Sequence, residues 1–136
     1  MNERDLLKAA YEARTFAYVP YSHFAVGAAL LTVSGKVYAG CNVENASYGA
    51  TNCAERTAFF KAVSEGKREF EAIAIVGGKE GQEPAGICSP CGVCRQVMRE
   101  FADPKKFRVI LEDGSGNVKS YLLEELLPES FGPENL

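Results

Sequence analysis

The segment from Ala72 to Val76 is apolar at every position, and it constrains the fold more than any other stretch of the chain. A short, unbroken apolar run of this kind is typical of a strand that is buried on both faces of a sheet. Helical patterns lie on either side of it, at residues 53–65 and 91–102, and another predicted strand follows at 107–111. Because strand–helix–strand connections within one sheet are right-handed, this order predicts a sheet with helices on both faces.

The rest of the chain completes the same pattern. Apolar residues at helical spacing, with Asn2 as cap and Pro20 as stop, predict a first helix through Leu6, Ala10, Ala13 and Ala17. We expect a hairpin from residues 24–32 and 36–40, a loop over 42–52, a last strand at 118–121 and a short helix at 122–127. The expected fold is one α/β domain spanning residues 1–136, a three-layer α-β-α sandwich with a mixed central sheet of about five strands.

The charge and composition of the chain limit the kinds of ligand that it is expected to bind. The chain has 15 Lys and Arg against 18 Asp and Glu, for a net charge of -3. This balance disfavours a general electrostatic hold on nucleic acid or an anionic membrane, so we expect a small-molecule ligand. No apolar stretch is long enough to cross a bilayer, and the charged N-terminus is unlike a secretory signal, so we expect a cytoplasmic protein.

The five cysteines are an odd number, and in a reducing compartment they indicate a metal or catalytic site before a disulfide. Cys91 and Cys94 are three residues apart, so at a helix start their sulfurs point the same way. Cys53, which precedes another predicted helix, is a third ligand. Three protein ligands that leave one tetrahedral position for water are typical of catalytic zinc.

Two neighbouring residues add chemistry to that site. Glu55 follows Cys53 by two residues, and we expect it to move protons beside the metal. Three thiolates leave the Zn²⁺ site with a net negative charge, which helix N-termini and a nearby arginine offset. Arg56 and Arg95 both lie within the first helical turns, and we expect Arg56 to be the closer partner.

These motifs together resemble the small, homotetrameric, zinc-dependent cytidine deaminases. The resemblance covers essentially the whole chain and rests on residues 21–24 with 26–30, 42–48, 53–58, 90–96 and 125–128. It implies a zinc-dependent hydrolysis of cytidine and 2′-deoxycytidine to the uridine nucleosides and ammonia, in pyrimidine salvage. It also implies one zinc ion per subunit on the three cysteines, with Glu55 as acid and base.

The resemblance also assigns substrate contacts. It implies that Asn42 and Glu44 hold the ribose hydroxyls, that the backbone at Ala54 meets the base edge, and that Phe24 packs against the pyrimidine. In the family, active sites lie at subunit interfaces, where neighbouring subunits complete each pocket. That role would fall here to Tyr48 and Phe131.

Other interpretations remain open at this stage. Cys88 begins a Cys-x₂-Cys-x₂-Cys run that resembles an iron–sulfur motif, but Met98 stands where its fourth cysteine would be. We interpret Cys41 as a buried apolar residue and His23 as an exposed loop residue. A deaminase of another small substrate, such as blasticidin S, is one alternative function, and a structural zinc module is another.

Overall fold

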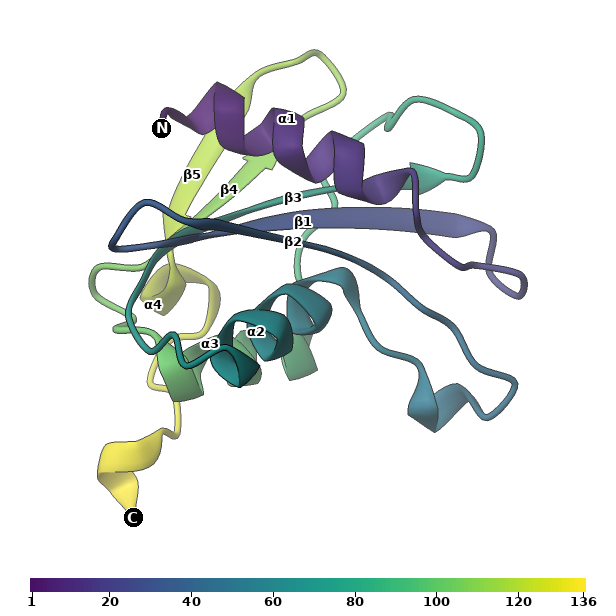
Figure 1. Ribbon diagram of the computed structural model, residues 1–136. Coiled ribbons are helices and arrows are strands. Elements are labelled where there is room, and N and C mark those ends of the chain that lie inside the picture. Colours follow the sequence, from purple (N-terminus) through teal and green to yellow (C-terminus); the bar gives the residue numbers. More distant parts are fainter.

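The computed structural model describes residues 1–136 and shows one mixed sheet of five strands (Figure 1). In spatial order the strands are β2 (Val37–Cys41), β1 (Phe24–Thr32), β3 (Phe70–Lys79), β4 (Arg108–Glu112) and β5 (Val118–Leu122). Only β3 and β4 are parallel, and the other neighbouring pairs are antiparallel. The predicted mixed sheet is therefore confirmed.

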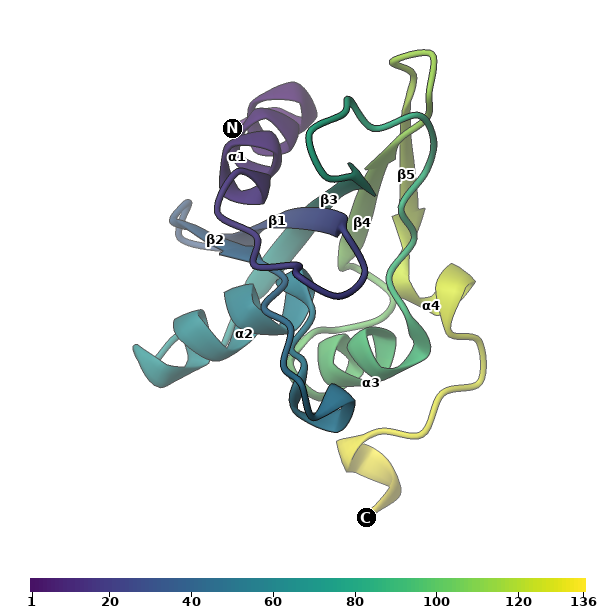
Figure 2. The same ribbon diagram turned by 90° about the vertical axis from the view of Figure 1, so that its right-hand side faces the viewer.

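Helices cover both faces of the sheet, which confirms the three-layer sandwich. Helix α1 (Glu3–Arg14) lies on one face, and α2 (Ala54–Ser64), α3 (Gly92–Phe101) and the short α4 (Leu123–Leu126) lie on the other (Figures 1 and 2). Two separate apolar clusters fill the spaces between these layers. Ile73 of β3 belongs to the cluster under α2 and α3, while its neighbour Ala74 belongs to the cluster under α1. Successive residues of a strand face opposite sides, so β3 is buried on both faces, as its continuous apolar run predicts.

Helix α1 begins as predicted but ends earlier. The Asn2 side chain caps the helix by accepting a hydrogen bond from the Asp5 N–H over 2.8 Å. The regular helix stops at Arg14, so the expectation that it continues through Ala17 is wrong. At its end, the Arg14 guanidinium donates to the carbonyls of Ala25, Gly78 and Lys79 on β1 and β3. The last side chain of the helix is thus hydrogen-bonded to the sheet, and the chain then leaves the helix and leads to β1.

Two glycines allow helices to lie directly on the sheet. A Cβ atom on Gly27 of β1 would lie 2.0 Å from the Ala10 carbonyl oxygen of α1. A Cβ atom on Gly40 of β2 would lie 2.6 Å from the Ala54 carbonyl oxygen of α2. The first turn of α2 is therefore set by backbone contact with the edge strand β2.

The connections place the starts of α2 and α3 close together. Cys53 is the N-cap residue of α2 and Cys91 is the N-cap residue of α3. Strand β3 continues to Lys79, beyond the predicted end at Val76, because Phe24 to Thr32 of β1 pairs with its whole length. None of the helices has both the length and the apolar character that crossing a bilayer requires.

Candidate active site

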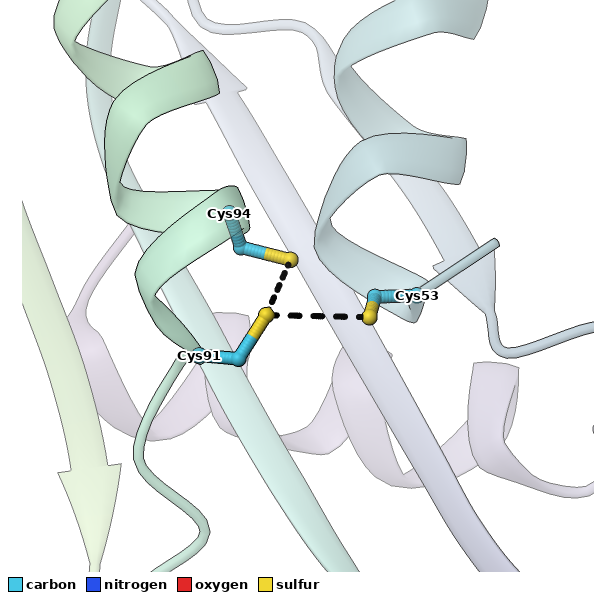
Figure 3. Close-up of side chains that lie close together, drawn as sticks. All are labelled: Cys53, Cys91 and Cys94. Atoms are coloured by element: carbon cyan, nitrogen blue, oxygen red, sulfur yellow. Dashed lines mark hydrogen bonds between the residues drawn. The ribbon is translucent and has the colours of Figure 1, made fainter. Parts of the chain in front are cut away.

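Three cysteine sulfurs converge between the N-termini of α2 and α3 (Figure 3). The Cys91 sulfur lies 3.9 Å from that of Cys53 and 3.5 Å from that of Cys94, and all three sulfurs lie within 4.8 Å of one another. A tetrahedral zinc ion with Zn–S bonds of about 2.3 Å separates its sulfurs by about 3.8 Å. The spacing of the three sulfurs thus fits a single zinc ion.

Arg56 supplies positive charge to this cluster from the first turn of α2. Its Nη2 donates a hydrogen bond to the Cys53 sulfur over 3.2 Å, while its Nε is buried without a hydrogen-bond partner. Hydrogen bonds from the Cys94 thiol and from Arg56 lower the pKa of Cys53 to about 5. A partly buried guanidinium beside a preferred thiolate suits a metal site whose ligands carry surplus negative charge. The donor set therefore fits Zn²⁺ in chemistry as well as in spacing.

Arg95 does not reach the sulfurs, although the sequence placed both Arg56 and Arg95 within possible reach of them. Its guanidinium donates instead to the Pro90 carbonyl, the Leu126 carbonyl and the Ser89 hydroxyl, at 2.6–2.7 Å. Of the two arginines, Arg56 is the closer partner, as expected.

Glu55 lies in the first turn of α2, directly between Ala54 and Arg56, and only 5% of its surface is exposed. Burial is the largest effect on this carboxyl group, and it raises the pKa of Glu55 to about 7. A carboxyl group that is balanced between its two protonation states near neutral pH suits proton transfer in both directions. Ala54 itself is fully buried at the start of the same helix.

The Asn42 side chain is hydrogen-bonded to the backbone at the beginning of β1. Its Oδ1 accepts the Val26 N–H and its Nδ2 donates to the Phe24 carbonyl, both over 2.9 Å. One Nδ2 hydrogen remains for a further acceptor. The structure thus joins two predicted substrate contacts, since Asn42 holds the backbone of Phe24, whose ring lies at the surface at the start of β1.

Glu44 is held by the loop that leads into β1. Its Oε1 accepts the N–H groups of Tyr21 and Ser22 over 3.0 and 3.1 Å, and its Oε2 accepts the Ser22 hydroxyl. The hydrogen bond from the Ser22 hydroxyl is the main reason why the pKa of Glu44 is lowered, so the group is an acceptor. Sequence reasoning missed Ser22 as a partner, because no local spacing relates residues 22 and 44.

Tyr48 and Phe131 lie apart from the sulfurs, on exposed segments. Tyr48 is 76% exposed and lines a cavity of about 360 Å³ together with Tyr21, Ser22, Glu44 and Thr51. Its ring meets that of Tyr21 edge to face, with centroids 6.0 Å apart. Phe131 is 59% exposed on the C-terminal segment, and its carbonyl accepts a hydrogen bond from Gln96 of α3.

The remaining cysteines and the single histidine stay outside the cluster. Cys88 packs against β3, where a Cβ atom on Gly77 would lie 2.6 Å from its sulfur, and burial raises the pKa of its thiol to about 12. It does not join the group of sulfurs that an iron–sulfur cluster would need. Cys41 ends β2 as expected, but it is half-buried, so the expectation that it is a buried residue is wrong. His23 is an exposed loop residue, as expected, and pairs with Glu80.

Comparisons with known proteins agree with this geometry. The family profile of the cytidine and deoxycytidylate deaminase zinc-binding region matches residues 1–110. A cytidine deaminase of Sporosarcina psychrophila is 48% identical over 136 residues, which cover all of this chain and 96% of the relative. The chain belongs to the cytidine and deoxycytidylate deaminase family.

Further deaminases share both the sequence and the fold. A cytidine deaminase of Halalkalibacterium halodurans is 50% identical over all of this chain and 98% of its own length. The crystal structure of cytidine deaminase from Burkholderia pseudomallei has a TM-score of 0.87 and 52% identity, with 96% of this chain and 100% of that chain covered. The structure of the Mycobacterium tuberculosis cytidine deaminase has a TM-score of 0.81 at 39% identity, over 97% of this chain and 98% of that chain. Both the predicted family and the predicted fold are thus confirmed.

Proposed function

We propose that the protein is a cytidine deaminase that hydrolyses cytidine and 2′-deoxycytidine to uridine and 2′-deoxyuridine with release of ammonia, as an enzyme of pyrimidine salvage in the cytoplasm. The convergence of the Cys53, Cys91 and Cys94 sulfurs beside the buried Glu55 is the observation that carries this proposal. Relatives named cytidine deaminase, 48 and 50% identical over the whole chain, support the same activity.

Zinc held by the three cysteines supplies Lewis-acid chemistry, which makes water acidic enough to act as a nucleophile near neutral pH. Glu55 moves the protons. Its carboxylate takes one proton from the attacking water and delivers it to N3 of cytosine. It then takes the second proton from the hydroxyl group formed at C4 and passes it to the amino group, which leaves C4 as ammonia. The water oxygen remains at C4 and becomes the carbonyl oxygen of uridine.

Glu44, Asn42 and Phe24 orient the substrate. Ionised carboxylates offer about four acceptor positions, and protein donors occupy three of those on Glu44, which leaves one on Oε2 for a ribose hydroxyl. Asn42 keeps one amide hydrogen for the same sugar. Phe24 packs against the pyrimidine, and the backbone at Ala54 meets the base edge beside Glu55.

We further propose that the enzyme is a homotetramer whose active sites lie at subunit interfaces, where Tyr48 and Phe131 from neighbouring subunits complete each pocket. Two observations support this arrangement. Both aromatic side chains are largely exposed in one chain, at 76 and 59%. The cavity beside Glu44 is open, so a single chain leaves the ribose in contact with solvent.

The test is a direct absorbance assay of cytidine loss with purified, zinc-loaded protein, combined with zinc analysis and light scattering. We expect one zinc ion per chain, a mass near four times 14.7 kDa and stoichiometric ammonia. Turnover of blasticidin S without turnover of cytidine would replace the proposed substrate. Bound zinc without any deaminase activity would favour a structural zinc module.

A further inference from the structure

Helix α3 carries a row of polar side chains that bind the C-terminal segment of the chain. Arg95 and Arg99 are four residues apart and therefore lie on the same side of the helix. Arg95 donates to the Leu126 carbonyl over 2.6 Å, and Arg99 donates to the Ser130 hydroxyl over 2.7 Å and pairs with Glu134. The yellow segment after α4 passes α3 in both views of the fold (Figures 1 and 2).

Arg95 connects this segment to the cysteine loop. The same guanidinium that binds Leu126 also donates to the Pro90 carbonyl and to the Ser89 hydroxyl, each over 2.7 Å. Pro90 directly precedes Cys91. One side chain therefore joins the peptide that leads into a metal ligand to a part of the chain more than thirty residues away.

The fit between Arg99 and the C-terminal segment is close. The Arg99 side chain is 9% exposed, and a Cβ atom on Gly132 would lie 2.3 Å from its Cζ. The backbone at Gly132 thus lies directly against the guanidinium. Any residue with a Cβ atom at this position would force the guanidinium or the backbone to move. A buried cation needs its partners, because leaving it unpaired is strongly unfavourable. Ser130 and Glu134 therefore bind Arg99 together, with the Gly132 backbone packed against the guanidinium.

Helix α3 needs such support. It has only 10 residues, of which Cys94, Met98 and Arg99 are buried, and helices this short are marginal without tertiary contacts. We infer that Arg95 and Arg99 are positioning residues, which use the segment from Leu126 to Glu134 to hold α3 and the Cys91 loop in the geometry that binds zinc. The segment lies beyond residues 1–110, the part that the family profile matches. The inference rests on the proposed zinc enzyme and assigns its C-terminal segment to the support of the metal site.

The test measures how fast the full-length, zinc-loaded protein releases zinc to a chromogenic chelator. The double variant Ser130→Ala/Glu134→Ala removes both acceptors of Arg99 without changing α3. Gly132→Ala places a methyl group directly against the Arg99 guanidinium. Because loss of residues that orient metal ligands commonly weakens metal binding by about 10- to 100-fold, we expect release to be about tenfold faster or more. Arg95→Lys keeps the charge but cannot bridge three acceptors, so we expect it to release zinc faster as well.

Two variants serve as controls. Arg68→Ala removes a guanidinium that binds the carbonyls of Val63, in the last turn of α2, and Lys67, and Gly86→Ala adds a methyl group in open space. Both should release zinc at the native rate. Circular dichroism and the melting temperature check that each variant is folded, and hydrogen exchange at α3 checks that the C-terminal segment has been loosened.

The outcomes separate this inference from the proposed function. Faster exchange at α3 with an unchanged rate of zinc release, in the folded double variant, would overturn the positioning role. Native protein that binds zinc but does not deaminate cytidine would overturn the proposed function alone. The direct variant Arg99→Ala removes the buried cation itself, and if it does not fold, the variants of the C-terminal segment still decide the matter.

Discussion

The Arg56 guanidinium lies against the Cys53 sulfur, with 3.2 Å between Nη2 and Sγ, and no carboxylate is paired with it. Cys53 is the N-cap of α2 and Arg56 is three positions later in its first turn, so the contact follows from helix geometry alone. Three thiolates on Zn²⁺ leave one net negative charge, which weakens the ion as a Lewis acid. The unpaired guanidinium offsets that charge where it is largest.

Arg56→Ala should therefore lower turnover at neutral pH and weaken zinc binding, each by about 10- to 100-fold. Without the cation, the water nucleophile ionises less readily, so the acidic limb of the pH–rate profile should move to higher pH. Measured profiles of the two proteins check the shift, and competition with a chelator checks the affinity. Superimposable profiles would mean that the helix N-termini offset the charge without Arg56.

Glu55→Gln should abolish proton transfer while leaving the site assembled. The amide has nearly the same shape as the carboxyl group, and the buried position tolerates a neutral group well, since burial disfavours the charged form. We expect turnover to fall by about 10²- to 10⁴-fold or more, with zinc content and cytidine affinity close to native. Single-turnover kinetics and equilibrium binding measure the two effects separately. Near-native turnover would remove Glu55 from the mechanism.

Removal of zinc should inactivate the protein without unfolding it. The apolar clusters on the two sheet faces contain most of the buried side chains, and Cys94 is the only sulfur ligand that belongs to either as a buried member. We expect the chelated protein to keep its far-ultraviolet circular dichroism and to regain activity when Zn²⁺ is restored. Loss of the helical signal on chelation would show that the metal is needed for the fold itself.

The elements that could be predicted from sequence are those set by local pattern. The apolar run at Ala72–Val76 and the spacing of Cys91 and Cys94 act within a few residues, and both predictions are confirmed. The extension of β3 through Gly77 and Gly78 was missed, because glycines also indicate loops. Here they remain in the strand because they pair with Ala25 and Val26 of β1. Glycine suits both positions because Cys88 and Pro84 pack where a Cβ atom would be.

Contacts between distant residues set the remaining features. Carbonyls of β1 and β3 bind the Arg14 side chain at the end of α1, and the Leu126 carbonyl binds that of Arg95. Both arginines have polar partners in the folded chain that no spacing in the sequence identifies. The same holds for Glu44, whose orientation comes from Tyr21 and Ser22.

Gly27→Ala should destabilise the fold, because the new methyl group would lie 2.0 Å from the Ala10 carbonyl oxygen. Helix α1 must move away from β1 to accommodate it, and overpacking of this kind costs about 1–3 kcal/mol or more of the free energy of unfolding. Denaturant titration measures the change. The matched control is Gly86→Ala, where nothing lies within 4 Å of the added atom and the stability should stay near native. Equal midpoints for the two variants would contradict the close approach of α1.

The last prediction concerns the size of the substrate, and it rests on Glu44. Tyr21 and Ser22 fix this carboxylate, and their hydrogen bonds lower its pKa, so it remains an anion where the ribose is expected. An anion that accepts a ribose hydroxyl repels a phosphate at the same place, and a site built to accept a hydroxyl group disfavours ligands that lack one there. Cytidine and 2′-deoxycytidine should therefore be turned over, with little or no activity on cytidine 3′-monophosphate or single-stranded oligonucleotides. The net charge of -3 agrees, since a polynucleotide needs a basic surface along its backbone. Comparable kcat/KM values for cytidine and its 3′-monophosphate would refute the role of Glu44, and efficient deamination of an oligonucleotide would change the substrate class.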